Sequence, residues 1–433
     1  MENLFCLNER GTTVKTEIIA GITTFLAMVY ILAVNPNLLS QTGMDQGGVF
    51  TATALASGVA TLIMAFVANL PVALAPGMGL NAFFTYSVVL GAGYSWQVAL
   101  TAVFLEGILF VVLSVLKIRS AVIKAIPSTL KKSVAVGIGL FITLIGLADG
   151  GIVSNTTGTI IGFAPLQGQA LVAIIGLIIT IVLLCLKVPA AIIIGMLLTT
   201  VIGIPFGVTT LPENFSPFSL PSAPILFAFD FSNIVSLKFL TVFFTFLFVD
   251  MFDTIGTLMG VAEQSNLKDE NGDIHNVNQA LFADAAGTII GAMLGTSTVT
   301  SFVESTAGIA QGGRTGLSSL VTGLLFFLAL FLSPIFLLIP SCASAPALII
   351  VGFLMMKSIT HIDFEDISEG LPAFISIISM VFSYSIATGI SWGVMSWCIC
   401  KIASRKIKEI PVITWILFAV FLLKTVMDIW QIS

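Results

Sequence analysis

The sequence predicts an all-α membrane protein that crosses the bilayer many times, and three observations support this fold class. Of its 433 residues, 57% are hydrophobic and only 9% are charged, whereas about a quarter of the residues of a soluble chain carry charge. Apolar runs of helical length recur from one end of the chain to the other, bounded by Gly, Pro and charged residues. Two of these runs are interrupted at matching places in the two halves of the chain.

The apolar runs form two series of seven predicted spans, 14 in all. An upright helix needs about 20 residues to cross the membrane, so the shorter runs are expected to break or tilt. A further run, Val412–Val426, is either another span or a helix lying on the membrane, which leaves the side of the C-terminus open. The first series is Glu17–Val34, Phe50–Asn69, Pro71–Leu90, Gln97–Leu116, Lys132–Ala148, Gly168–Leu186 and Pro189–Phe206, and the second is Lys238–Val261, Asn278–Leu294, Gly295–Gln311, Gly316–Ile339, Ala345–Met356, Leu371–Ile386 and Gly389–Cys400.

The two series look like repeats of one another. The tripeptide Ile-Pro-Ser precedes both the fifth and the twelfth span, at 126–128 and 339–341, an offset of 213 residues that also places Gly139 on Gly352. Seven spans in each half give the halves opposite orientations, which is the inverted repeat of many secondary transporters. We expect a first repeat at 14–206, a second repeat at 238–402 and a C-terminal apolar segment at 403–433.

Basic residues predict the orientation, because loops rich in Lys and Arg stay on the cytoplasmic side. Two clusters follow the fourth and fourteenth spans, whereas the long connection 207–237 carries neither Lys nor Arg. Counting spans places both clusters on the N-terminal side, so the N-terminus is expected in the cytoplasm. The clusters are Lys117, Arg119, Lys124, Lys131 and Lys132, and Lys401, Arg405, Lys406 and Lys408.

The stretch 295–316, GTSTVTSFVESTAGIAQGGRTG, contains the interrupted span of the second half. Thr296 to Ser301 alternates hydroxyl and β-branched residues, which favours an extended strand over a helix. Glu304 follows, and a carboxylate at membrane depth costs about 2.5–3.5 kcal/mol on insertion scales. Such a residue is retained where it faces a cavity, an ion or a polar substrate, so this segment predicts a transport site.

The interrupted span of the first half is PVALAPGMGLNAFFTYSVVL, at 71–90. Pro76 prevents a helix from running through it, Gly77 and Gly79 loosen the backbone, and a second helical piece is expected near Asn81. The paired interruptions indicate the binding site of a transporter, where half-helix N-termini present free N–H groups to the substrate. Asn81 would either contact the substrate or cap the half-helix, and the sequence leaves both readings open.

The eighth span adds acids to this picture. Asp250, Asp253 and Thr257 recur at i, i+3 and i+7 and therefore share one helical face. With Glu304 they are candidates for a polar site at the membrane midplane. The alternative is that they are protonated acids that hydrogen-bond helices together.

Other polar residues are expected to be structural or peripheral. Glu106 and Asp284 are interpreted as hydrogen-bond partners within the bundle, and Asp149 lies at a span end. His275 and His361 fall in polar segments outside the spans, so any coupled protons must be carried by carboxylates. No P-loop, H-E-x-x-H motif or nucleophile–base pair is present, so neither a cofactor nor an enzyme is predicted and transport must run on a gradient.

Several long motifs carry a family resemblance. APGMGLNAFF, FVDMFDTIGTLMG and GTSTVTSFVESTAGIAQGGRTGL resemble the AzgA-like purine permeases of the nucleobase-ascorbate (nucleobase:cation symporter-2) superfamily. EIIAGITTFLAMVYILAVNP is similar to the first span of that family, and LPAFISIISMVFSYSIATGISWG to its thirteenth and fourteenth spans. The resemblance extends over nearly the whole chain.

The resemblance implies a seven-plus-seven inverted repeat whose core domain (14–116 plus 238–339) rocks against a gate domain (117–206 plus 340–402). Spans 3 and 10 would each contribute a short strand, paired antiparallel at the midplane. The related uracil and xanthine carriers bind the base through an acid in span eight and an acid or amide in span ten. Asp253, which matches an acid-x-x-Gly pattern with Gly256, and Glu304 are the corresponding residues here.

The function that follows is import of a purine base, guanine or hypoxanthine, by proton symport. The alternatives are an adenine permease of the same family, an anion transporter of the same fold, and a passive channel. The implied partners are the base, a proton and membrane lipid, but not nucleic acid, and a homodimer stays open. The residues expected to bind substrate are Asp253, Glu304, Asn81, Thr300, Ser301 and Phe302, and those expected to couple protons are Asp253, Glu304 and Asp250.

Overall fold

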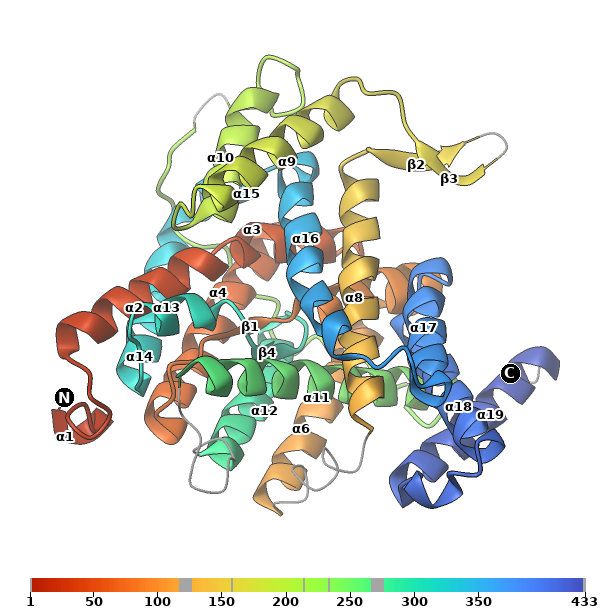
Figure 1. Ribbon diagram of the computed structural model, residues 1–433. Coiled ribbons are helices and arrows are strands. Elements are labelled where there is room, and N and C mark those ends of the chain that lie inside the picture. The colour runs from red at the N-terminus through yellow and green to blue at the C-terminus, as the bar shows by residue number, and fades with distance from the viewer. Residues whose placement is uncertain are drawn as a thin grey trace.

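A computed structural model describes residues 2–116, 127–156, 159–212, 215–232, 234–265 and 276–430. In this part of the chain, helices surround two short strands, β1 (Leu74–Pro76) and β4 (Val299–Ser301), that meet near the centre of the molecule (Figure 1). The basic residues 117–124 and His275, named above, lie outside the described residues.

The first predicted span consists of two helices, α2 (Val14–Met28) and α3 (Ile31–Ser40), separated by Val29 and Tyr30. The short helix α1 (Glu2–Phe5) precedes them. α4 (Gln46–Ile63) begins where the Asp45 carboxylate accepts a hydrogen bond from the Gly48 amide at 2.6 Å, and it ends in a wider π-helical turn, η1 (Met64–Ala68). Capping carboxylates of this kind satisfy amides that the first helical turn leaves without partners.

Both interrupted spans fold as the sequence predicts, into a strand followed by a helix. β1 leads into α5 (Met78–Ala82) and η2 (Phe83–Gly91), and β4 follows α12 (Val277–Leu294) and precedes α13 (Ser305–Ala310). The strands pair antiparallel, with Leu74 opposite Ser301, Ala75 opposite Thr300 and Pro76 opposite Val299. The prediction of two short strands in these segments is therefore confirmed.

The other elements follow the predicted order, with one addition. A second strand pair, β2 (Val153–Thr156) and β3 (Thr159–Phe163), lies between the fifth and sixth predicted spans and was not predicted. The apolar run near the C-terminus is helical. The remaining helices are α6 (Trp96–Val115), α8 (Ser128–Asp149), α9 (Gln169–Cys185), α10 (Ala191–Gly203), α11 (Leu237–Ser265), α14 (Gly316–Ala329), η3 (Leu330–Leu332), α15 (Ser333–Leu337), α16 (Ser341–Met355), η4 (Met356–His361), α17 (Ile367–Phe382), α18 (Ile386–Ala403), η5 (Ile407–Glu409) and α19 (Val412–Trp430).

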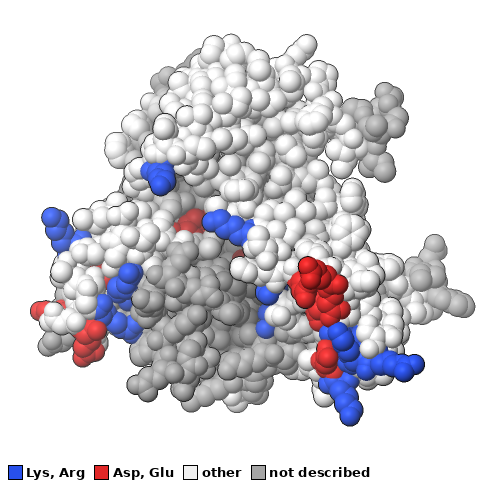
Figure 2. Space-filling view, in the orientation of Figure 1, with Lys and Arg blue, Asp and Glu red and all other residues white. Residues whose placement is uncertain are grey.

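The lengths and surface of these helices fit a membrane. Within the described ranges, eight helical segments are long and apolar enough to cross a bilayer, and shorter apolar helices accompany them. Large apolar side chains such as Val112, Leu328 and Phe353 are exposed on helix surfaces, where lipid would cover them. On the face shown in Figure 2, the charged side chains lie in the middle and lower parts of the molecule, and the upper part is almost free of them. The protein is therefore a multi-pass membrane protein.

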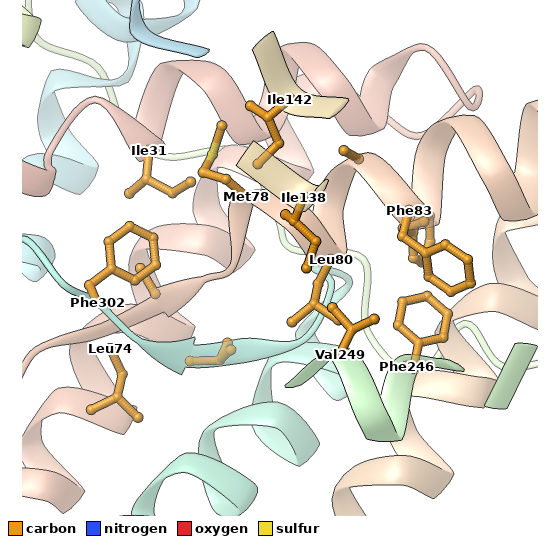
Figure 3. Close-up of a cluster of buried hydrophobic side chains, with 14 of the residues drawn as sticks. Ile31, Leu74, Met78, Leu80, Phe83, Ile138, Ile142, Phe246, Val249 and Phe302 are labelled. Carbon is orange, nitrogen blue, oxygen red and sulfur yellow. The ribbon is translucent and has the colours of Figure 1, made fainter. Parts of the chain in front are cut away.

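The helices around the strands pack through apolar side chains and small residues. Figure 3 shows Leu74, Met78, Ile138, Val249 and Phe302 converging from five different segments on the region of the strand pair. α8 and α16 lie side by side (Figure 1), and they approach closely because both carry glycine at the contact. A Cβ atom on Gly139 would lie 2.7 Å from the carbonyl oxygen of Gly352.

Candidate substrate-binding site

A cavity of about 160 Å³ lies beside the strand pair. It is bounded by the α2–α3 break, the β1–α5 junction, the middle of α8, α11, the β4–α13 connection and the C-terminal part of α16 with η4. Segments from both ends of the sequence therefore build one site. Its walls are Tyr30, Gly77, Met78, Gly79, Val134, Ala135, Ile138, Asp253, Thr257, Ser301, Phe302, Val303, Glu304, Val351, Leu354, Met355 and Ser358.

Two carboxyl groups face this cavity. Asp253 comes from the middle of α11 and Glu304 from the turn before α13, and both are partly buried. Glu304 is held from one side, because its Oε1 accepts a hydrogen bond from the Tyr30 hydroxyl at 2.5 Å. The remaining walls are mostly apolar. A small apolar chamber with a few converging polar groups is typical of a site for a small organic ligand.

Gly77 allows the strands and α11 to come together at this point. A Cβ atom on Gly77 would lie 2.6 Å from the Thr300 Cγ2 atom and 3.5 Å from Asp253 Oδ2. The first of these separations is shorter than a normal contact. The glycine that the sequence interprets as loosening the backbone therefore also makes room for the strand pair beside Asp253.

The predicted site residues divide into two groups. Asp253, Ser301, Phe302 and Glu304 line the cavity, whereas Asn81, Thr300 and Asp250 are not in its walls. The Asn81 amide is buried, accepts a hydrogen bond from the Ser297 hydroxyl, and donates to the Pro76 carbonyl oxygen at 3.3 Å. Asn81 was expected either to contact the substrate or to cap the half-helix. In the structure its side chain makes no helix cap and is not part of the cavity wall. It connects α5 to the segment before β4.

Asp250 and Thr300 belong to a buried polar cluster behind β4. The Thr254 hydroxyl lies 3.3 Å from Asp250 Oδ1, 2.8 Å from the Thr300 hydroxyl and 2.9 Å from both carboxylate oxygens of Asp284. Asp284 also accepts the Ser301 amide at 3.1 Å. The cluster therefore links α11, α12 and β4, and it fixes the strand that carries part of the cavity wall.

Hydroxyl side chains complete the hydrogen bonding of the short strands. Thr61 both donates to and accepts from the backbone of Leu74, at 3.2 and 3.0 Å, and Thr298 donates to Glu106 Oε2 at 3.1 Å. A two-stranded ladder inside an apolar bundle has no water to satisfy its outer edges. The density of Thr and Ser around β4 in the sequence is the signal of this arrangement.

Three residues that the sequence did not assign to the site also hold it together. Tyr30 was overlooked because a tyrosine in an apolar span is usually a core residue, although its buried hydroxyl needs a partner. Arg314 donates from its guanidinium to the carbonyl oxygens of Ile309 and Gly313, at 2.9 and 2.7 Å, near the end of α13. The Arg314 amide donates to the buried Glu17 carboxylate at 2.8 Å.

Comparisons with known proteins agree with this architecture. Residues 15–392 match the permease family. The chain is 45% identical to the guanine/hypoxanthine permease PbuG of Bacillus subtilis, over 98% of this chain and 99% of that protein. It is 39% identical to the adenine permease AdeQ of Escherichia coli, over 99% of this chain and 96% of that protein.

Among solved structures, the transmembrane domain of the cyanobacterial bicarbonate transporter BicA shares the fold, with a TM-score of 0.66 and 17% identity over 86% of this chain and 97% of that one. The anion transporter Slc26a9 from mouse gives a TM-score of 0.65 with 12% identity, over 90% of this chain and 69% of that one. At these identities the structures support the fold alone. The match over residues 15–392, together with relatives at 39–45% identity over almost the entire chain, shows that this chain belongs to the permease family and is a membrane transport protein, not an enzyme.

Proposed function

We propose that this permease imports a purine base, guanine or hypoxanthine, by proton symport across the cytoplasmic membrane of a bacterium. The observation that carries the proposal is that Asp253 and Glu304, from segments far apart in the sequence, share one largely apolar cavity beside the strand pair. Similarity to two Bacillus subtilis proteins named as guanine/hypoxanthine permeases, at 45% and 43% identity, supports the same substrate class.

The chemistry of the cavity suits a base with adjacent N–H donors. A carboxylate accepts two hydrogen bonds in its plane, and the N1–H and N2–H₂ edge of guanine offers such a pair. Hypoxanthine offers the N1–H alone. The flat faces of the ring would lie against apolar walls such as Ile138, Phe302 and Met355.

Adenine is the second candidate, because two Escherichia coli relatives at 39% identity are named adenine permeases. Adenine presents a donor beside an acceptor on its hydrogen-bonding edge. That pattern suits a protonated acid, which donates through one oxygen and accepts through the other. The two candidates therefore differ in the protonation state that the cavity must hold.

A rocking inverted repeat is the proposed mechanism of access, with 14 spans, a core domain at 14–116 plus 238–339 and a gate domain at 117–206 plus 340–402. The cavity supports this division, since one wall belongs to the core and the other, from Val134 to Ile138 and Val351 to Ser358, belongs to the gate. Gly139 and Gly352, which occupy equivalent positions in the two repeats, also contact each other, as residues beside a twofold axis would.

Polar contacts between the proposed core and gate domains support a conformation in which the cavity is closed to one side of the membrane. The Tyr86 hydroxyl donates to both Asp149 oxygens at 2.9 Å, and the Ser87 hydroxyl donates to the Tyr384 carbonyl oxygen at 3.2 Å. Asp149, which the sequence places at a span end, is the last residue of α8 and contacts the proposed core domain. In the proposed orientation this is the external side.

The basic clusters support that orientation. Lys131 and Lys132, at the other end of α8, share a cavity of about 540 Å³ with Lys401. Lys131 and Lys132 of the first cluster and Lys401 of the second therefore lie at one end of the bundle, and in Figure 1 the N-terminus lies toward the same end. Because loops rich in basic residues remain in the cytoplasm, we place the N-terminus there.

Radiolabelled uptake in cells lacking their own carriers tests the proposal, with guanine, hypoxanthine, adenine, uracil and sulfate as the panel. Guanine and hypoxanthine should accumulate above the external concentration. Adenine uptake without guanine uptake would support the second candidate. Uptake of sulfate but none of the bases would overturn the proposal in favour of an anion transporter, and equilibration without accumulation would indicate a channel.

A further inference from the structure

Tyr30 lies at the one break in the first predicted span, between α2 and α3. Its ring is only 1% exposed, it forms part of the cavity wall, and its hydroxyl lies 2.5 Å from Glu304 Oε1. A hydroxyl at this distance from a carboxylate is a short, charge-assisted donor when the acid is ionised. Tyr30 therefore contacts a residue that the proposed function assigns to the substrate.

We propose that Tyr30 is the positioning residue for Glu304: by occupying Oε1 it holds the carboxyl group in the orientation in which the other oxygen receives the N–H donor of the base. This inference rests on the proposed function, in that the cavity takes a nucleobase. It assigns to Tyr30 an effect on substrate affinity and selectivity that acts through Glu304.

Glu304 gains from such a partner because its side chain caps none of the amides of α13. The residue stands at the N-terminal boundary of α13 with helical angles, φ −59° and ψ −17°, and its side chain makes no capping hydrogen bond. A free glutamate side chain loses about 1.5–2 kcal/mol of rotamer entropy when it is fixed. If Tyr30 fixes the side chain before the base binds, binding does not have to order it.

Tyr30 can serve as this anchor because it is itself rigid. Its ring is enclosed by the bundle, and its carbonyl oxygen accepts the amides of Ala33 and Val34 at 3.0 Å, which attaches it to the start of α3. A tyrosine side chain has only two rotatable angles between backbone and ring, so little freedom is lost when it bonds. The Tyr30–Glu304 pair also joins α3 to α13 across 274 residues of sequence.

The substitution Tyr30→Phe removes the hydroxyl and keeps the ring that packs in the wall. Loss of a hydrogen bond to a charged group corresponds to a change of about tenfold or more in an equilibrium constant. We expect the KM for guanine uptake to rise about tenfold and the Vmax to stay within about twofold. The matched control Tyr94→Phe removes a hydroxyl outside the cavity wall and should change neither value. An unchanged KM for Tyr30→Phe overturns the proposal.

Two further measurements separate positioning from a general structural role. If Tyr30 acts through Glu304, then adding Tyr30→Phe to Glu304→Ala, which removes the acceptor of the Tyr30 hydroxyl, should weaken the residual guanine binding by much less than the tenfold seen alone, because effects within one contact are not additive. Full additivity overturns the proposal. Binding is read as displacement of radiolabelled guanine from purified protein in detergent.

The second measurement does not depend on the substrate. Carbodiimide labelling of Glu304, followed by mass spectrometry, should be several-fold faster in Tyr30→Phe than in the wild type and in Tyr94→Phe, because the freed carboxyl group is no longer shielded on one oxygen. Equal labelling rates overturn the inference even if guanine is transported. If the wild type takes up no base, the proposed function fails, and the labelling rates still decide whether Tyr30 holds Glu304.

Discussion

Replacement of Glu17 by alanine should destabilise the protein more than loss of any other single side chain near the N-terminus. Glu17 is fully buried at the start of α2. Its carboxylate accepts the backbone amides of Arg314, Thr315 and Ser318 at 2.8, 3.4 and 3.2 Å, and the Ser318 hydroxyl at 2.6 Å. These amides belong to the first turn of α14 and the residues before it, so one side chain caps a helix from the other end of the chain.

The expected magnitude follows from the groups left behind. The Ser318 hydroxyl keeps an alternative acceptor, the Thr315 carbonyl oxygen at 3.0 Å, so it adds little. Three backbone amides lose their acceptor, and an unsatisfied buried donor costs about 1–3 kcal/mol. Because the bond at 3.4 Å is weak and Arg314 is only partly buried, we take the lower end of each range. Glu17→Ala should therefore lose about 3 kcal/mol of unfolding free energy.

Unfolding of purified protein by titration with a denaturing detergent, followed by tryptophan fluorescence, measures this loss. Glu17→Gln keeps one acceptor oxygen and should lose roughly half as much. Glu9→Ala, at an exposed position, should match the wild type. If Glu17→Ala unfolds within about 0.5 kcal/mol of the wild type, the amides of α14 find other partners and the capping argument is refuted.

Three further predictions concern transport. Glu304→Ala should insert normally but lose uptake, because the N–H donors of the base would be buried without partners, and near-normal uptake would contradict its role. Asp253→Asn should keep base-for-base exchange in proteoliposomes but lose uphill accumulation. Asp250→Asn, behind the strand pair, should reduce accumulation less. The opposite result would exchange the two assignments. Uptake should collapse with a protonophore and survive removal of sodium, and the reverse pattern would exclude proton coupling.

The strand pair was predictable because its signal is local. A run of Thr, Ser and Val inside an apolar span cannot be a stable lipid-facing helix, and Pro76 stops the helix in the other half. The pairing itself followed from the resemblance, since nothing in either segment alone indicates its partner. Likewise the acids of the eighth and tenth spans stood out by their cost in a bilayer.

The cavity wall was less predictable, because it depends on which way each side chain points. Thr300 and Ser301 are neighbours on β4, and successive strand residues face opposite sides. Thr300 joins the cluster through Thr254, whereas Ser301 lines the cavity while its hydroxyl also lies 3.5 Å from Asp284 Oδ1 in that cluster. The role of Thr300 and Asn81 in substrate binding stays a prediction. The Tyr30–Glu304 contact joins residues 274 positions apart, and only the folded arrangement of the bundle reveals it.

Under the proposed function, the half-helices beside the cavity also bear on the choice between an anion and a neutral base. α5 and α13 each begin at the cavity, beside Gly77–Gly79 and Glu304, and a helix N-terminus carries partial positive charge that favours an anion. Two solved structures with this fold are named as a bicarbonate transporter and an anion transporter. In this chain two carboxyl groups, Asp253 and Glu304, line the cavity beside these helix N-termini. Under the proposed function, a free anion would meet like charge there, whereas a neutral base would find hydrogen-bond acceptors, so we expect the two acids to favour a nucleobase over an anion.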